Sequence, residues 1–155
     1  MPALTWTDDL SVGIEVIDGQ HKRIVDYINQ LHEAHVTGEK ELLNRVLEEL
    51  IDYTQSHFGF EETVMEEAGY AFLKAHRRVH ELFIRKIGQF HDRHRSGEDV
   101  TVELSNILVS WLVNHIKRED RDYSGVVQKH LGAGASEPPR QGGWLSGALR
   151  RFFRG

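Results

Sequence analysis

The sequence predicts an all-α protein: an up-down-up-down antiparallel four-helix bundle with an N-terminal arm and a short C-terminal amphipathic tail. Three observations predict this fold. Apolar residues recur at the i, i+3, i+4 spacing of amphipathic helices in four successive segments. No proline occurs between residues 3 and 137, which permits long helices. The connections between the four segments are short, and short connections favour antiparallel neighbours.

The arm, residues 1–17, has no helical period and is expected to pack over the bundle. Its expected packing residues are Trp6, Leu10, Val12 and Ile14. Asp18 is the expected N-cap of the first helix, because its side chain can accept hydrogen bonds from free backbone N–H groups. The first three helices are expected at about 19–36, 39–67 and 70–95, and the fourth is expected to begin near residue 100. The bundle domain is expected to comprise residues 1–131. Phe72 and Val102 are expected to face the core.

The composition is that of one soluble globular domain, with 155 residues, 39% hydrophobic and 28% charged. The absence of cysteine excludes a disulfide framework, a thiolate zinc site, an iron–sulfur cluster and a cysteine nucleophile. A net charge of −5 argues against nucleic acid as a partner. No apolar run approaches the ~20 residues that span a bilayer, and the first ten residues lack an export signal. A cytoplasmic location is therefore expected.

Ten histidines are the unusual feature of the composition, and several of them interrupt the apolar stripes. Seven ligand-type side chains occupy core-facing positions: His21, His57, Glu61, His76, His80, His115 and Asp120. His57–Glu61 and His76–His80 are i, i+4 pairs, so each pair shares one helix face. One such pair is weak evidence, because a buried histidine is more often a hydrogen-bonded core residue than a ligand. In an up-down-up-down bundle, however, all seven positions lie at one level.

Burial of so many ionisable groups is costly unless a cation compensates them. Two six-coordinate metal ions offer twelve ligand positions. Five imidazoles, two bridging carboxylates and one bridging oxygen fill eleven of these, which leaves one position open to a small molecule. Such nitrogen-rich, carboxylate-bridged sites suit iron, whereas structural zinc prefers four ligands.

The spacing of His115 and Asp120 is less regular than that of the other pairs. Five residues span about 140° on a straight α-helix. A local π-bulge would reconcile the spacing, and so would an aspartate that reaches across between two metal ions. The sequence is compatible with both.

The pattern His21, His57-xxx-Glu61, His76-xxx-His80 and His115-xxxx-Asp120 resembles the non-haem di-iron signature of the hemerythrins, particularly the single-domain bacteriohemerythrins. The segments VGIEVIDGQHK and WLVNHI add to a likeness that covers residues 6–131. The resemblance implies a four-helix bundle and reversible O2 binding. It also implies two non-haem iron ions, Fe2+ or Fe3+, joined by an oxo or hydroxo bridge.

The resemblance further implies a role for each ligand. His76, His80 and His115 would bind a six-coordinate iron, His21 and His57 would bind a five-coordinate iron, and Glu61 and Asp120 would bridge the two. O2 would bind at the five-coordinate iron, in a dry pocket that holds no further carboxylate or tyrosine. Candidates for its apolar wall are Trp111, Leu112 and Ile116, for which plain core packing is an equal explanation.

The leading interpretation is a protein that carries, stores or delivers O2 and is not an enzyme. The alternatives are an O2 or redox sensor, a di-iron enzyme that scavenges peroxide or nitric oxide, and an iron store. Storage proteins of the ferritin type use Glu-x-x-His motifs, which this sequence lacks. The charged run 117–119 and the five remaining histidines are expected to be polar surface groups: His32, His35, His91, His94 and His130.

The C-terminal segment carries a separate hypothesis. Residues 132–143 have the composition of a linker, and residues 144–155 place three arginines beside an apolar stripe, as a short interfacial helix does. The tail could bind the anionic inner surface of a membrane or dock on a partner such as an O2-consuming membrane enzyme. It could also fold back on the acidic surface of residues 1–131. The first two interpretations are slightly favoured.

Overall fold

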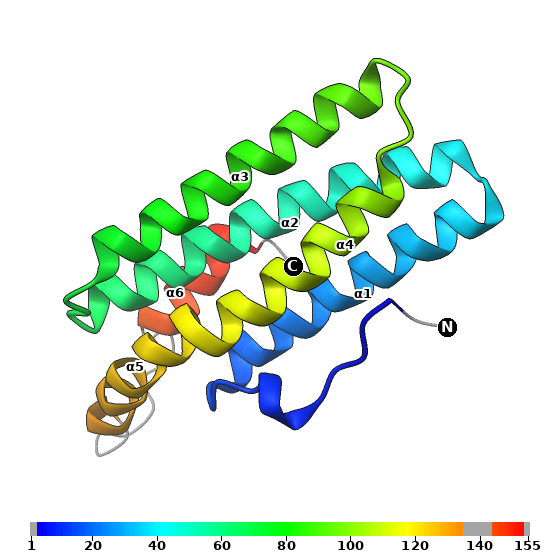
Figure 1. Cartoon of the computed structure of the whole chain (residues 1–155). Coiled ribbons are helices and arrows are strands. Elements are labelled where there is room, and N and C mark those ends of the chain that lie inside the picture. Colours follow the sequence, from blue (N-terminus) through cyan, green and yellow to red (C-terminus); the bar gives the residue numbers. More distant parts are fainter. Residues whose placement is uncertain (1–2, 135–143, 154–155) are drawn as a thin grey trace.

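Four long helices form the bundle in the computed structural model, which describes residues 3–134 and 144–153 (Figure 1). The helices are α1 (Glu15–Thr37), α2 (Lys40–Glu67), α3 (Leu73–Arg95) and α4 (Thr101–His115). Successive helices run antiparallel, and α1 packs against both α2 and α4. No strand occurs within the described ranges. The predicted all-α, up-down-up-down bundle is confirmed.

The fourth helical rod continues beyond His115. It passes through a π-helical turn, η2 (Ile116–Asp120), into α5 (Arg121–Gly134). The helix therefore runs three residues into the segment that composition predicts to be a linker. The rest of that segment, 135–143, lies outside the described residues.

The arm packs over the bundle as expected, through the short 3₁₀ turn η1 (Asp8–Leu10) and the buried residues Val12 and Ile14. The first helix begins at Glu15, earlier than predicted, so Asp18 is not its N-cap. Instead the Asp18 carboxylate accepts hydrogen bonds from the Val12 N–H at 2.9 Å and from the Ser11 hydroxyl at 2.5 Å. Asp18 thus connects the arm to α1 through side-chain hydrogen bonds.

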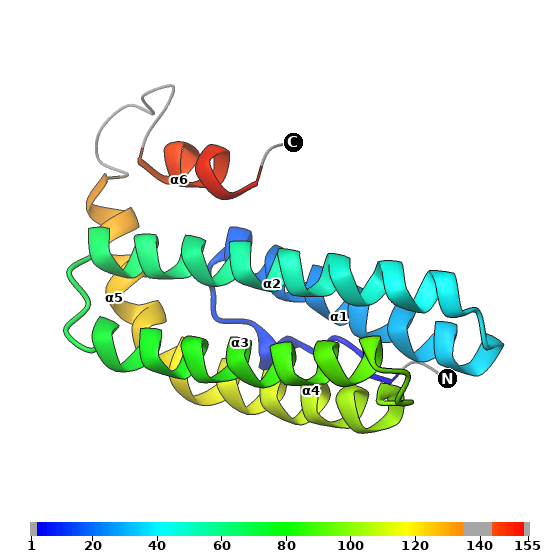
Figure 2. The same ribbon diagram turned by 90° about the horizontal axis from the view of Figure 1, so that it is seen from above.

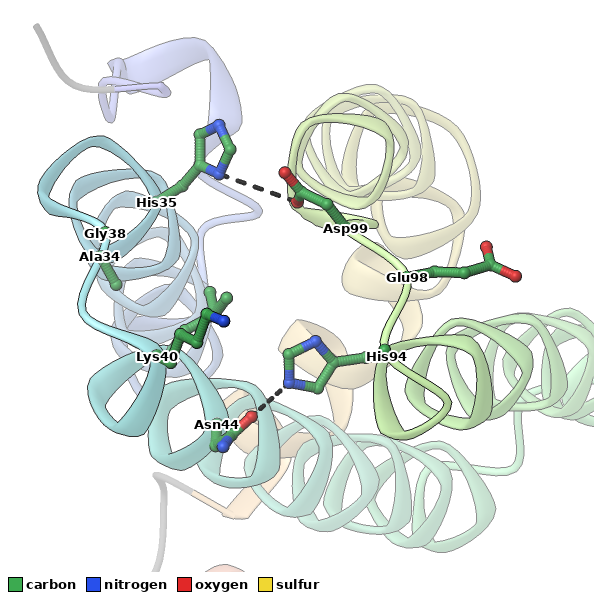
Figure 3. Close-up of a pocket in the computed structure, with 10 residues that line it drawn as sticks. Ala34, His35, Gly38, Lys40, Asn44, His94, Glu98 and Asp99 are labelled. Carbon is green, nitrogen blue, oxygen red and sulfur yellow. Dashed lines mark hydrogen bonds and ion pairs between the residues drawn. The ribbon is translucent and has the colours of Figure 1, made fainter.

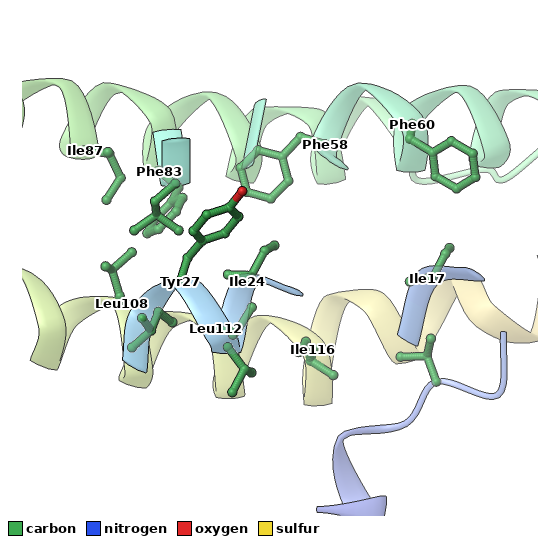
Figure 4. Close-up of a cluster of buried hydrophobic side chains, with 14 of the residues drawn as sticks. Ile17, Ile24, Tyr27, Phe58, Phe60, Phe83, Ile87, Leu108, Leu112 and Ile116 are labelled. Carbon is green, nitrogen blue, oxygen red and sulfur yellow. The ribbon is translucent and has the colours of Figure 1, made fainter. Parts of the chain in front are cut away.

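One apolar cluster fills the space between the four helices (Figure 4). Two residues expected in it lie outside, since Phe72 is 68% exposed and Val102 is 57% exposed. Phe72 is in the turn before α3, which begins at Leu73, later than predicted. Val102 lies in the first turn of α4, where it lines a surface pocket beside His32 and His35 of α1.

The tail forms a short helix, α6 (Trp144–Phe152), that folds back on the bundle. Figure 2 shows it beside α2, on the side of α2 away from α3. Ala148 is only 5% exposed, and Leu145 and Leu149 are half-buried. The described tail thus takes the fold-back arrangement, through apolar contacts rather than ion pairs. None of the described helices combines the length and the apolar character needed to cross a membrane.

The role of Asp18 can be tested by replacement with alanine. Asp18→Ala should lower the free energy of unfolding by about 1–3 kcal/mol, because it leaves the Val12 N–H without its charged acceptor. Asp26→Ala, on the exposed face of the same helix, is the control and should change stability by less than about 0.5 kcal/mol. Urea denaturation measures both; equal losses in the two variants would contradict this role.

Candidate metal centre

The structure brings all seven predicted side chains together at one end of the bundle core. Each of them is at most 4% exposed: His21, His57, Glu61, His76, His80, His115 and Asp120. They come from the start of α1, the end of α2, the start of α3 and the end of the fourth rod. Antiparallel packing places these four helix ends at one level, so residues up to 99 positions apart meet in one cluster.

The Glu61 carboxylate divides the histidines into two groups. Its Oε1 atom lies 3.1 Å from His21 Nε2 and 2.8 Å from His57 Nε2. Its Oε2 atom lies 3.7 Å from His76 Nε2 and 3.3 Å from His80 Nε2. Each oxygen therefore faces a different group of imidazoles.

The Asp120 carboxylate repeats this division from the opposite helix. Its Oδ2 atom lies 3.1 Å from His21 Nε2. Its Oδ1 atom lies 3.1 Å from His76 Nε2 and 3.0 Å from His115 Nε2. Each carboxylate offers one oxygen to a two-histidine group and one to a three-histidine group, an arrangement that can bridge two metal ions.

The π-helical turn explains the five-residue spacing of His115 and Asp120. A turn closed by i→i+5 hydrogen bonds accommodates one residue more than an α-helical turn. It therefore returns Asp120 to the inner face that His115 occupies, with both residues buried. Of the two explanations left open by the sequence, the structure has the π-bulge.

Several buried polar atoms of the cluster have no hydrogen-bond partner. Among them are Glu61 Oε2, His76 Nε2 and both Asp120 oxygens. Buried polar atoms are almost always satisfied, because desolvation without a partner costs about 1–3 kcal/mol or more. Imidazole nitrogens and carboxylate oxygens are metal ligands, so bound cations would satisfy these atoms. The donor set fits a pair of metal ions.

Protonation of the cluster differs from residue to residue. Burial lowers the pKa of His21, but the Asp120 and Glu61 carboxylates outweigh it and raise the value to about 9. The same balance raises the pKa of His76 to about 9 and that of His115 to about 10. For His57 burial prevails, so its pKa is lowered and the ring stays neutral. The neighbouring histidines hold the pKa of Glu61 well below its usual value despite its burial.

Polar residues behind the ligands orient the imidazole rings. His57 Nδ1 donates a hydrogen bond to Gln20 Oε1 at 2.6 Å. Glu62 Oε1 lies 3.5 Å from His80 Nδ1, and Glu119 Oε2 lies 3.6 Å from His115 Nδ1. The Gln20 hydrogen bond can hold the His57 ring with Nε2 toward the cluster, whereas Glu62 and Glu119 lie at ion-pair distance behind His80 and His115. The expectation that the 117–119 run is only a surface feature is wrong for Glu119. A search for carboxylates beside each ligand in the sequence would have found it.

Tyr123 is a further residue of the centre that the sequence reading missed. It is fully buried, and its hydroxyl donates a hydrogen bond to Glu61 Oε1 at 3.1 Å. Burial, reinforced by Glu61 and Asp120, raises the pKa of Tyr123 well above 10, so the phenol stays a neutral donor. The sequence indicated no tyrosine that had to fall in the O2 pocket, and the structure places Tyr123 against Glu61 Oε1, the oxygen that faces His21 and His57. The signal was its position three residues after Asp120, one helical turn along the same face.

Apolar and aromatic side chains enclose the ligands. The Phe58 ring stacks on His80 with centroids 3.8 Å apart, and the Trp111 ring stacks on His115 at 4.3 Å. Leu112 and Ile116 are buried beside the same helix end (Figure 4). The two stacked rings cover His80 and His115, whereas His76 lines a pocket of about 320 Å³.

Two of the histidines expected to be surface groups lie at the opposite end of the bundle. His35 and His94 line a pocket of about 460 Å³ between the end of α1 and the end of α3 (Figure 3). His35 Nδ1 lies 3.9 Å from Asp99 Oδ1, and His94 contacts the side-chain oxygen of Asn44. Both have polar partners at the bundle end, as expected.

Comparison with known proteins identifies the family. The profile described as "Hemerythrin HHE cation binding domain" matches residues 12–127. The chain belongs to the hemerythrin family. A bacteriohemerythrin of Pseudomonas aeruginosa is 50% identical over 153 residues, 99% of each chain. One from Methylococcus capsulatus is 34% identical over 125 residues, 79% of this chain and 95% of the relative. A solved wild-type hemerythrin is 32% identical, with a TM-score of 0.76, and the match covers 80% of this chain and 97% of that chain.

These hemerythrin relatives support O2 binding at a di-iron centre as the function of the chain. They also differ in how far they extend. The Pseudomonas match includes α6, whereas the other two cover about four-fifths of this chain.

The raised pKa values predict how the metal-free protein responds to pH. A histidine whose pKa rises from 6.5 to about 9 on folding adds stability below pH 6.5, and this is lost as the pH rises through 9. Raising the pH from 6 to 10 should therefore lower the free energy of unfolding. The expected loss is about 3 kcal/mol for each histidine whose pKa differs by ~2.5 between the folded and unfolded chain. Denaturant titrations of chelator-treated protein test this. Iron-loaded protein is the control, because ligated nitrogens hold no proton there.

The role of Gln20 can be tested by Gln20→Leu, which keeps the volume and removes the acceptor of the His57 Nδ1–H. We expect a 10–100-fold loss of affinity for one of the two metal ions, since His57 is then free to rotate or change tautomer. Gln55→Leu, on the exposed face of α2, is the matched control. Anaerobic Fe²⁺ titration by calorimetry measures the affinities, and unchanged binding in Gln20→Leu would exclude this role.

Proposed function

We propose that the chain binds O2 reversibly, as a carrier or store, at two non-haem iron ions held by His21, His57, Glu61, His76, His80, His115 and Asp120. The observation that carries this proposal is the division of the histidines into groups of two and three by two carboxylates. With a bridging oxo or hydroxo group, two ions held by this set would have one coordination position left for a small molecule, beside His21 and His57. Two ferrous ions supply the two electrons that reversible O2 binding requires.

The residues of the chain have distinct tasks in this proposal. Glu61 and Asp120 hold the two ions together. Tyr123 donates to Glu61 Oε1 and so orients the bridging carboxylate. Its raised pKa keeps the phenol proton in place, so the hydroxyl remains a hydrogen-bond donor to Glu61.

The apolar wall excludes water, which would promote irreversible oxidation of the ions. We assign this task to the rings of Phe58 and Trp111, which stack on His80 and His115, and to the buried residues Leu112 and Ile116, which lie close to His115 along the chain. We propose a carrier rather than an enzyme because five of the seven candidate ligands are imidazoles and only two are carboxylates. A carboxylate-rich shell, as in ferritin-like proteins, favours oxidase chemistry instead.

The proposals about location and partners are separate. A cytoplasmic location agrees with the absence of cysteine. Association of residues 144–155 with a membrane surface or an O2-consuming membrane enzyme would require release of α6. Its apolar face now packs against α2, so a lipid or protein partner would compete with α2 for that face.

The test is an optical titration of the reduced, iron-loaded protein with O2, followed by purging with argon. A visible absorption band that appears with O2 and disappears on purging is the expected result. Glu61→Gln should hold fewer than two iron ions and lose the band, whereas Glu66→Gln, exposed on the same helix, should retain both.

Oxidation that purging does not reverse would contradict the carrier proposal. It would instead favour the redox sensor or the scavenging enzyme, which turnover with peroxide or nitric oxide would separate.

A further inference from the structure

Helix α6 lies directly behind the turn of α2 that carries two of the ligands. Gly59 stands between His57 and Glu61, and the Phe152 ring of α6 packs against its Cα. A Cβ atom built on Gly59 would lie 2.5 Å from Phe152 Cε1. Position 59 therefore admits this contact only because it is a glycine.

A second aromatic contact extends the docking of α6 along α2. The Phe153 ring lies 5.3 Å from the Tyr53 ring and 6.0 Å from the Phe60 ring. Phe60 is fully buried and directly precedes the ligand Glu61. The segment 57–61 thus presents His57 and Glu61 to the metal cluster and Gly59 and Phe60 to the tail.

The same turn is held from the inside as well. Tyr123 donates to Glu61 Oε1 at 3.1 Å, and it belongs to α5, the helix from which the chain continues toward α6. The C-terminal segment therefore contacts the ligand turn twice, with Tyr123 on the metal side and Phe152 on the outer side.

We infer that α6 is a positioning helix for the metal centre: docked on Gly59, it holds the His57–Glu61 turn, so that α6 docking and metal binding stabilise each other. This inference rests on the proposed function, because it requires the seven side chains to bind iron. The two-histidine ion depends on it most, since His57 is one of its two imidazoles. The other ion receives from this turn only one Glu61 oxygen, and its imidazoles come from α3 and α4.

Because α6 is short, its helical structure depends on its contacts with α2. An isolated helix of nine residues is unstable in water, so docking on α2 is what keeps α6 helical. Coupling between two sites is reciprocal. If docking of α6 raises the affinity for the metal ion by some factor, binding of the ion raises the equilibrium constant for α6 docking by the same factor.

Gly59→Ala and Phe152→Ala test the inference in the full-length chain. The first places a Cβ where the Phe152 ring lies, and the second removes that ring. Anaerobic titration with Fe²⁺, followed by calorimetry, should show that each variant binds one of its two ions about tenfold more weakly, the lower end of the effect of residues that orient ligands. The double variant should be no weaker than Phe152→Ala alone, because the clash with residue 59 is then gone.

Gly88→Ala is the matched control. It makes the same change inside α3, where a new Cβ meets nothing within 4 Å. Both glycine variants gain helix propensity, so only loss of the α6 contact distinguishes them. Circular dichroism verifies that each variant folds, and Phe152→Ala leaves α2 itself unchanged if Gly59→Ala does not fold.

Limited trypsin digestion gives the reciprocal readout. Arg150 and Arg151 are exposed on α6, and cleavage there requires the helix to unfold locally. In the unsubstituted chain, bound Fe²⁺ should slow this cleavage by about the same factor by which docking strengthens metal binding. In Phe152→Ala the metal should no longer slow it.

The outcomes separate the two proposals. If the variants release α6, as judged by cleavage, yet bind both ions like the unsubstituted chain, α6 is not coupled to the centre and the inference is wrong. The di-iron proposal would then stand. If the unsubstituted chain itself fails to bind two iron ions, the proposed function fails and the inference fails with it.

Discussion

The structure depends on the burial of two carboxylates among five imidazoles at one end of a bundle core. Without protons or metal ions to balance them, Glu61 and Asp120 would be uncompensated charges in an apolar interior. In the metal-free chain, the raised pKa values of His21, His76 and His115 show protons taking part of that role. The same nitrogens could bind either protons or metal ions, so bound metal would link folding and pH through one cluster.

The backbone of the fourth helical rod departs from regular α-helix where Asp120 has to reach the cluster. A regular α-helix would carry Asp120 away from the inner face, where it has to meet His21 from α1 and His76 from α3. The π-helical turn at Ile116–Asp120 inserts the extra residue that corrects the orientation. It also sets the direction of α5, which brings Tyr123 onto Glu61. One local irregularity thus positions both the Asp120 carboxylate and the Tyr123 hydroxyl that donates to Glu61.

The surroundings of the ligands are as specific as the ligands themselves. Gln20 orients His57, and aromatic rings stack on His80 and His115. On the outer face of α2, the absence of a side chain at Gly59 lets Phe152 approach the ligand turn. The tail that composition describes as a basic amphipathic segment is therefore part of the packing around the centre, and its apolar face is already occupied.

The fold class and the seven candidate ligands were readable from the sequence, because both follow from periodicity. Apolar residues at helical spacing define four helices, short connections make them antiparallel, and that topology places His21, His57, His76 and His115 at one level. Helix starts were predicted less well: α1 begins before Asp18, and α3 begins after Phe72, since backbone hydrogen bonds and neighbouring packing decide them. Several individual side-chain contacts outside this pattern were not predicted. Three features depend on side-chain packing in three dimensions. They are the approach of Tyr123 to Glu61, the π-helical turn between His115 and Asp120, and the docking of α6 on Gly59. Periodicity records which face of a helix is buried, whereas only the tertiary structure decides what that face meets.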